Sequence, residues 1–230
     1  PVPANSFGKT YGLHREKLEF NFKQHKKIQS YCKKKKIEYM CSAWDITSLK
    51  QLIKLRVKHI KIPSACNNNE ELLFYLFEKF NGYIHISLGM TTKQEEEKIF
   101  NMSKKYKKNK NLILYACTSD YPVKHKDICL LEISRLRKKY EKKICAIGFS
   151  GHHHGISADV AAGTLGAKWI ERHFTLDRTL KGTDHAASLE PDGARRVKRD
   201  LDLLLESLTY KKTRILNCEL KQRKKLKFDI

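Results

Sequence analysis

The chain has 230 residues, and its 47 Lys and Arg outweigh its 25 Asp and Glu to give a net charge of +22. This length suits one domain with a sizeable core, and no apolar run approaches the roughly 20 residues of a membrane helix, so we expect no membrane-spanning helix and no membrane partner. The lysine runs lie on predicted helix exteriors, connections and the tail, without interleaved aromatic residues, which favours a solvated basic surface over specific nucleic-acid binding.

The elements alternate along the chain between strand-like and helix-period segments. Residues 1–15 form a Gly-, Pro- and Asn-rich loop able to carry ligand contacts, and 15–35 form a long helix. Apolar, β-branched or aromatic runs predict strands at 37–42, 59–63, 83–88, 112–117, 144–149 and 168–174. Helix-period segments are 46–55, 69–80, 92–106, 127–140, 157–166 and 192–208. Charge density rises after Tyr210, so 211–230 is predicted to be a basic linker or partly ordered tail.

Successive predicted strands are about 21 to 32 residues apart, the interval of repeated βα units. Six such units fit either an open doubly wound sheet or a (β/α)8 barrel without its first units. Polar residues follow nearly every strand, as expected where all strand ends surround one mouth, and no GxGxxG follows any strand. We therefore predict an α/β fold, an incomplete (β/α)8 TIM barrel over residues 1–210.

His152 and His173 follow two consecutive predicted strands with one helix between them. Such parallel strands lie side by side, about 4.8 Å apart, so the two imidazoles can converge on one ion. Neutral imidazole is the commonest protein ligand of a transition metal. We predict a metal site at this pair, against the alternative of two packed or solvated residues. His153, His154 and His185 are predicted to be polar loop residues instead.

A lysine and several serines also stand at strand ends. Lys61, in HIKIPSA, is predicted to bind an anionic substrate group or to form a Schiff base, unless it is a rim lysine whose ammonium reaches solvent. Ser64, Ser87 and Ser150 follow three different strands, where their hydroxyls can donate hydrogen bonds to phosphate or carboxylate oxygens.

Two acidic residues accompany the second histidine. Glu171 precedes His173 by two positions, so in an extended strand both face the interior, while Arg172 faces outward. Glu171 is predicted to orient His173 or to face the substrate. Asp184, in a loop beyond the last strand, could hold sugar hydroxyls or help to fix the metal.

The seven cysteines are scattered without CxxC spacing, several of them inside apolar runs. This pattern suits reduced, packed thiols and predicts a cytoplasmic protein. The chain begins at Pro1 rather than Met, so we expect that residues upstream were removed or not recorded.

The order of these pieces resembles the sialic acid synthases (N-acylneuraminate synthases). The resemblance covers most of the chain: SAWD at 42–45, KIPS at 61–64, SLGM at 87–90, CTSDYP at 117–122, GFSGHH at 148–153, ERHFTLD at 171–177 and GTDHAASLEP at 182–191. It implies a (β/α)8 barrel that condenses phosphoenolpyruvate with an N-acylated amino sugar of the N-acetylmannosamine type. The products would be a 2-keto nonulosonic acid, a precursor of cell-surface polysaccharide, and phosphate.

The resemblance also implies roles for individual residues. His152 and His173 would bind a divalent metal, Mn²⁺ or Mg²⁺, that polarises the sugar aldehyde for attack by C3 of phosphoenolpyruvate. Catalytic roles would fall to these histidines and Lys61, after which water adds at C2 and phosphate leaves by C–O cleavage. Phosphoenolpyruvate would be held by Lys61, Ser87 and Ser150 with Ser42 nearby, and the sugar by Ser119, Tyr121 and Asp184.

The chain departs from the family pattern in three ways. Many members read SDHT where this chain has Ser150–Gly–His–His153, and the AEIG and KFQ segments of the first two strands are absent, as is the C-terminal antifreeze-like domain. We therefore expect a truncated, catalytically impaired homologue whose full-length parent is a homodimer. The alternatives are a metal-dependent TIM-barrel hydrolase and a non-catalytic basic binding protein.

Overall fold

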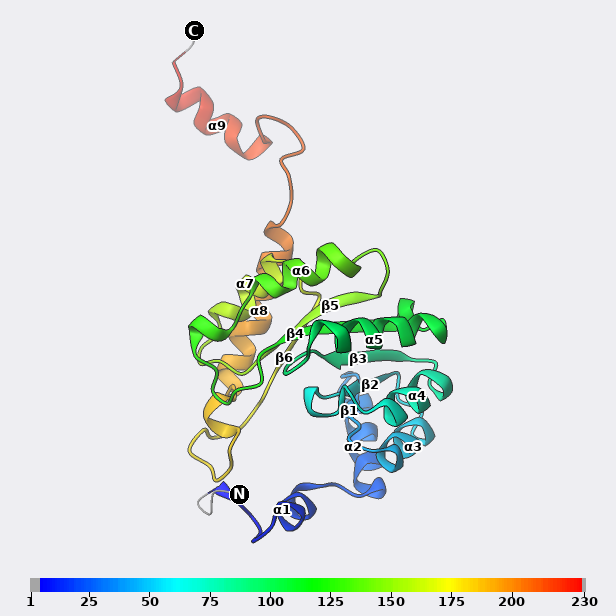
Figure 1. The fold of residues 1–230 in the computed structure, drawn as a ribbon. Helices are drawn as coiled ribbons and strands as arrows, with labels where there is room; N and C mark the ends of the chain where they lie inside the picture. The colour runs from blue at the N-terminus through cyan, green and yellow to red at the C-terminus, as the bar shows by residue number, and fades with distance from the viewer. Residues whose placement is uncertain (1–4, 229–230) are drawn as a thin grey trace.

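A computed structural model describes residues 5–228, and its centre is a six-stranded parallel sheet (Figure 1). Every strand pairs with the next one in sequence, in the order β1-β2-β3-β4-β5-β6. A doubly wound sheet would instead reverse its order at a switch point. The strands are β1 (Met40–Ser42), β2 (His59–Ile62), β3 (Tyr83–Ser87), β4 (Leu112–Cys117), β5 (Ala146–Gly151) and β6 (Trp169–Arg172).

The sheet curls into half of a barrel. His59 on β2 and Trp169 on β6 are four strands apart in the sheet, which in a flat sheet is a separation of roughly 19 Å. Their ring centroids lie 5.3 Å apart. This curvature confirms the predicted α/β, barrel-type fold for six βα units. A seventh and an eighth unit are not present among residues 5–228.

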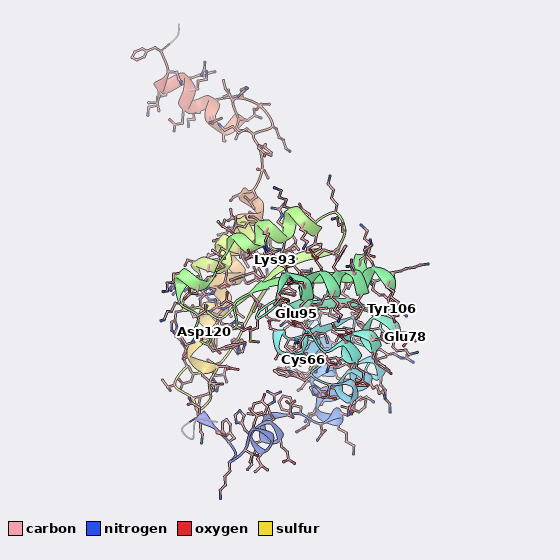
Figure 2. The ribbon with its side chains drawn as sticks, in the orientation of Figure 1. Cys66, Glu78, Lys93, Glu95, Tyr106 and Asp120 are labelled. Carbon is pink, nitrogen blue, oxygen red and sulfur yellow. The ribbon has the colours of Figure 1, made fainter. Side chains whose placement is uncertain are left out.

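Helices connect the strands and cover the outside of the curled sheet (Figure 1). They are α3 (Ile46–Lys54), α4 (Glu70–Lys79), α5 (Lys93–Lys105), α6 (Leu131–Tyr140), α7 (Ser157–Thr164) and α8 (Pro191–Ser207). Thr92 and Glu95 form a capping box at the start of α5, and Figure 2 places Lys93 and Glu95 at the start of this helix and Tyr106 at its end. α6 begins later than predicted, because 125–127 is a 3₁₀ turn and Cys129 adopts a left-handed φ of 53°.

The N-terminal part differs from the prediction. Instead of one helix over 15–35 there are two, α1 (Tyr11–Leu18) and α2 (Phe22–Lys34). The break is local, since Asn21 and Gln24 form a capping box that starts a new helix. α1 also begins inside the predicted loop, because the Thr10 hydroxyl accepts a hydrogen bond from the backbone N–H of Leu13. The first four residues of that loop lie outside the described part.

The basic tail contains a helix, α9 (Asn217–Leu226), which the sequence analysis did not predict. None of its residues is buried, and it stands away from the barrel in Figure 1. Across residues 5–228, no helix combines the length and apolar character needed to cross a membrane.

The two faces of the sheet have opposite chemistry, as strand alternation requires. Ile60, Ile62, Ile84 and Ile86 point outward, are fully buried, and belong to the apolar core between the sheet and the helices. The residues between them in sequence point inward and are largely polar. The inner face therefore supplies the site, while the outer face holds the fold together.

Candidate active site

A cavity of about 840 Å³ opens at the carboxyl ends of the strands. All of the predicted site residues line it: Ser42, Lys61, Ser87, Ser119, Tyr121, Ser150, His152, His173 and Asp184. The carboxyl ends of parallel barrel strands meet at one mouth, so residues distant in sequence converge there. Ser64, Cys117 and Glu171 share the same lining.

Lys61, at the centre of the cavity, is 7 % exposed. Its ammonium lies 2.8 Å from Glu171 Oε1, and Ser150 Oγ donates a 2.8 Å hydrogen bond to the same oxygen. The ring of Tyr115 lies beneath the ammonium, 5.8 Å from its centroid. Glu171 therefore faces inward as predicted, but its partners are Lys61 and Ser150, which sequence reasoning had assigned to the substrate.

Ser87 presents a buried hydroxyl with no hydrogen-bond partner among the described residues. The residue is 1 % exposed, and its backbone carbonyl is fixed by a 2.8 Å hydrogen bond from Asn67 Nδ2. Buried polar atoms are nearly always paired, because an unpaired one loses its hydration without compensation. An unpartnered hydroxyl in a cavity wall marks a place where a ligand atom can complete the pairing.

The two predicted metal ligands lie together at the cavity mouth. The rings of His152 and His173 are 5.2 Å apart between centroids, and the Tyr121 ring packs 4.2 Å from the first and 5.6 Å from the second. His152 Nδ1 lies 3.0 Å from the carbonyl oxygen of Thr118. Since a carbonyl only accepts, Nδ1 carries the proton there and Nε2 keeps its lone pair.

The surroundings shift the pKa values of the two histidines in opposite directions. Burial lowers the pKa of His173 below the usual value, and this outweighs the attraction of Asp184, whose Oδ2 is 3.5 Å from His173 Nδ1. Burial also disfavours the charged form of His152, but hydrogen bonds with the Cys117 thiol and the Thr118 carbonyl raise its pKa. The thiol of Cys117, which burial alone would make less acidic, has a lowered pKa because His152 is its hydrogen-bond partner.

These residues fit a divalent ion in part. His152 Nε2, which carries a lone pair in the neutral ring, and the neighbouring ring of His173 are suitable donors, and imidazole suits a transition ion better than Mg²⁺, which prefers oxygen ligands. Within residues 5–228, no group of three or more His, Cys, Asp or Glu side chains is gathered to hold an ion. The protein would thus contribute two imidazoles, leaving the other positions to water or substrate.

Several residues that line the cavity were not predicted from the sequence. Trp44 and the α1 residues Tyr11, His14 and Arg15 line the outer part of the cavity. The Arg15 guanidinium lies 4.9 Å from the centroid of the Trp44 ring. The sequence analysis had indicated ligand contacts only from a predicted loop over residues 1–15. In the structure, part of that segment is the helix α1.

The other three histidines near the site, His153, His154 and His185, differ in their burial. His153 lies in the loop between β5 and α7, as predicted, but it is completely buried. His154 is exposed and contacts Arg178, and His185 lies 2.8 Å from the Thr175 hydroxyl, so these two are polar loop residues as predicted. The difference arises from packing against α7, which strand-end periodicity does not reveal.

Comparison with known proteins identifies relatives of this chain. A family model described as the NeuB family matches residues 3–213. The chain is 37 % identical over 222 residues to N-acetylneuraminate-9-phosphate synthase of Mus musculus, covering 96 % of the chain and 60 % of the relative. The Drosophila melanogaster protein of the same name is 42 % identical over 190 residues, covering 83 % and 50 %.

A bacterial relative, N,N'-diacetyllegionaminic acid synthase of Campylobacter jejuni, is 36 % identical over 177 residues, covering 76 % of the chain and 52 % of the relative. The chain thus spans between half and three-fifths of the length of these relatives.

Solved structures give the same picture. N-acetylneuraminic acid synthetase from Leptospira borgpetersenii, in complex with citrate, superposes with a TM-score of 0.83 at 28 % identity, covering 96 % of this chain and 77 % of that one. A truncated 3-deoxy-D-arabino-heptulosonate 7-phosphate synthase from Thermotoga maritima reaches 0.68 at 16 % identity over 83 % of this chain and 74 % of that one, and shares the fold alone.

Proposed function

Because the chain belongs to the NeuB family, we propose that it carries the condensing site of a nonulosonic acid synthase. The reaction joins C3 of phosphoenolpyruvate to the aldehyde carbon of an N-acylated amino sugar and adds water at C2, giving a 2-keto acid and phosphate. One observation carries the proposal. A single cavity collects a buried lysine, an unpartnered buried serine hydroxyl and two adjacent imidazoles.

The inner end of the cavity suits phosphoenolpyruvate. Lys61 supplies the cation for its phosphate or carboxylate, and the Ser87 hydroxyl, which has no partner within the described chain, supplies a hydrogen bond. Glu171 holds both the ammonium of Lys61 and the hydroxyl of Ser150 through one oxygen. This shared contact keeps the two donors oriented before the substrate arrives, which reduces the reorganisation needed on binding. Ser42 lines the adjacent wall.

The histidine pair suits the sugar aldehyde. A divalent ion held by His152 and His173 would act as a Lewis acid toward the aldehyde oxygen, and two imidazoles favour Mn²⁺ over Mg²⁺. The Thr118 carbonyl fixes the tautomer of His152, and the Tyr121 ring restricts both imidazoles. Tyr121, Ser119 and Asp184 line the cavity beside this pair, where they would contact the sugar hydroxyls.

The sugar is proposed to be a 6-phosphate. The mouse and fly relatives are named as 9-phosphate synthases, and adding the three carbons of phosphoenolpyruvate turns C6 of a hexosamine into C9 of the product. The outer lining of the cavity includes the cationic side chains Arg15 and Lys181, and Lys181 lies over the ring of Phe7. A terminal phosphate has favourable electrostatics at this end.

The test is phosphate release by the purified protein supplied with phosphoenolpyruvate, Mn²⁺ and either N-acetylmannosamine or its 6-phosphate. Release that requires both substrates, with formation of a 2-keto acid, is the expected result, and the 6-phosphate should be preferred. Because the chain spans only part of its relatives' length and turnover can be slow, phosphoenolpyruvate binding is measured calorimetrically in parallel. No binding and no release would refute the proposal, and ester hydrolysis without phosphoenolpyruvate would favour the metal-dependent hydrolase.

A matched serine pair sharpens the binding measurement. Ser87→Ala should weaken phosphoenolpyruvate binding, because it removes the unpartnered hydroxyl of the cavity wall. Ser103→Ala is the control, since this buried serine on α5 donates to the Phe100 carbonyl, away from the cavity. The homodimer and the cytoplasmic location stay predictions. Light scattering would test the homodimer, and cell fractionation would test the location.

A further inference from the structure

A second cluster of charged residues lies behind the histidine pair, on the outer side of the sheet. Asp159, in the first turn of α7, and His153 are completely buried, and the Arg172 side chain is 5 % exposed. Arg172 Nη1 contacts Asp159 Oδ2 at 2.5 Å. Arg172 also borders the cavity that Glu171 faces, but its guanidinium is bound to Asp159, and neither Asp159 nor His153 lines the cavity.

The guanidinium of Arg172 ties separate segments together through their backbones. It donates hydrogen bonds to the carbonyl oxygens of His153 at 2.6 Å, Gly155 at 3.0 Å and Ala187 at 3.3 Å. The first two carbonyls belong to the loop between β5 and α7, and Ala187 belongs to the loop before α8. Asp159 provides the negative charge that holds the guanidinium in this position.

The tied segments are those that carry the site. His153 follows His152, Arg172 precedes His173, and Ala187 stands three positions after Asp184. The backbone continues this link, because Leu189 N–H donates to the His173 carbonyl and Val123 N–H donates to the His152 carbonyl. One buried ion pair is therefore connected to the segments that carry His152, His173 and Asp184.

Stability alone is a poor explanation for the pair. Asp159 Oδ1, Arg172 Nε and His153 Nδ1 are buried without hydrogen-bond partners among the described residues. Burying charges in this way carries a large desolvation cost, and apolar residues of similar volume usually stabilise as well or better. An apolar pair, however, could not donate hydrogen bonds to three carbonyl oxygens in different segments, as Arg172 does.

We propose that Asp159 is a positioning residue which, through Arg172, fixes the loops carrying His152, His173 and Asp184 relative to one another. The inference rests on the proposed function only in treating those three as site residues. The clamp itself (Asp159, Arg172 and the carbonyls of His153, Gly155 and Ala187) is defined by contacts that do not depend on catalysis.

Asp159→Asn tests the clamp in the 230-residue chain, because it keeps the shape and removes the charge. Native-state amide exchange should become faster by about tenfold or more at Val123, Thr175 and Leu189, whose N–H groups bond to the tied segments. Glu96→Gln is the matched control: Glu96 is also buried and bound by Arg135, but between α5 and α6. It should leave exchange at the three amides unchanged.

Mn²⁺ affinity, measured by calorimetry, provides a second readout. Groups that orient metal ligands typically change affinity by about 10- to 100-fold, so Asp159→Asn should weaken binding by that factor while Glu96→Gln does not. Arg172→Lys keeps the charge but loses the planar fork, and should fall between wild type and Asp159→Asn in both measurements.

The outcomes separate the two proposals. If wild type binds no Mn²⁺, the metal part of the proposed function fails, and amide exchange alone decides the clamp. Wild-type exchange at all three amides in folded Asp159→Asn would overturn the clamp. Should that variant not fold, the same measurements on Arg172→Lys decide, and unchanged exchange there overturns it too.

Discussion

The inner face of the sheet holds two polar clusters with opposite properties. The carboxyl-end cluster (Lys61, Ser150 and Glu171) is charged and opens into the cavity. The interior histidine cluster (His59, His85 and Tyr115) lies deeper and forms a chain of hydrogen bonds. His59 Nδ1 is 2.9 Å from His85 Nε2, and His85 Nδ1 is 2.8 Å from the Tyr115 hydroxyl.

Depth in the barrel decides which kind of polar group is tolerated. Burial lowers the pKa of His85 to about 3 and that of His59 below its usual value, and it raises the pKa of Tyr115. All three are therefore neutral and satisfy one another, with the Trp169 ring packed against both histidines. His59 and Lys61 are neighbours on the same face of β2. His59 nevertheless packs in the barrel interior, whereas Lys61 lines the cavity.

The largest expected effect comes from removing the histidine pair at the mouth. The double variant His152→Ala/His173→Ala should abolish detectable Mn²⁺ binding in calorimetry, because no third side-chain ligand is gathered there within residues 5–228. His154→Ala is the control, since this exposed residue lies in the same loop. Retained wild-type affinity in the double variant would mean that the ion binds elsewhere.

Next in size is the loss of the cavity cation. Lys61→Met keeps the side-chain length but removes the charge, and a hydrogen bond to a charged group contributes about 1.5–3 kcal/mol. Phosphoenolpyruvate affinity should therefore fall by roughly 10- to 100-fold. Lys58→Met removes a neighbouring lysine whose exposed side chain pairs with Glu38, and should leave the affinity unchanged. Equal effects of both variants would indicate nonspecific attraction by the basic surface.

A smaller effect should appear in the pH dependence of folding. Since the pKa of His85 is depressed, the unfolded chain binds more protons than the native one between about pH 6.5 and pH 3. The contribution of His85 to the free energy of unfolding is therefore complete above pH 6.5. It is lost as the pH falls, by up to about 1.4 kcal/mol per pH unit. His59 and Lys61, which face His85, oppose its protonation further.

Urea unfolding at several pH values measures this contribution. The stability difference between wild type and His85→Gln should shrink as the pH is lowered from 6.5, while the difference for His125→Gln, at an exposed histidine, should stay constant. A parallel decline in wild type and His85→Gln would show that His85 is not the source.

The smallest effect tests whether the interior cluster is structural only. Tyr115→Phe keeps the ring under Lys61 and removes the bond to His85 Nδ1, which should lower the free energy of unfolding by about 1 kcal/mol. Phosphoenolpyruvate affinity should not change. A large loss of affinity without a loss of stability would assign the hydroxyl to the site and erase the distinction between the clusters.

Much of the site could be predicted from the sequence because the relevant signals are local. Strand alternation alone placed Glu171 and His173 inward, and the site residues predicted at the strand ends all line one cavity. Helix boundaries set by capping residues, such as Thr92, were also readable. The misjudged helices were those where a local feature interrupts the pattern, as Asn21 does between α1 and α2.

The partners of those residues depended on the tertiary structure. Lys61 on β2 and Glu171 on β6 would lie roughly 19 Å apart in a flat sheet, and only its curvature brings them to 2.8 Å. The burial of His153 against Asp159 and Arg172, and the helix α1 beside the cavity, likewise arise from packing between distant segments. Periodicity along the chain determines which face a side chain takes, whereas the curvature and packing of the sheet determine what it meets there.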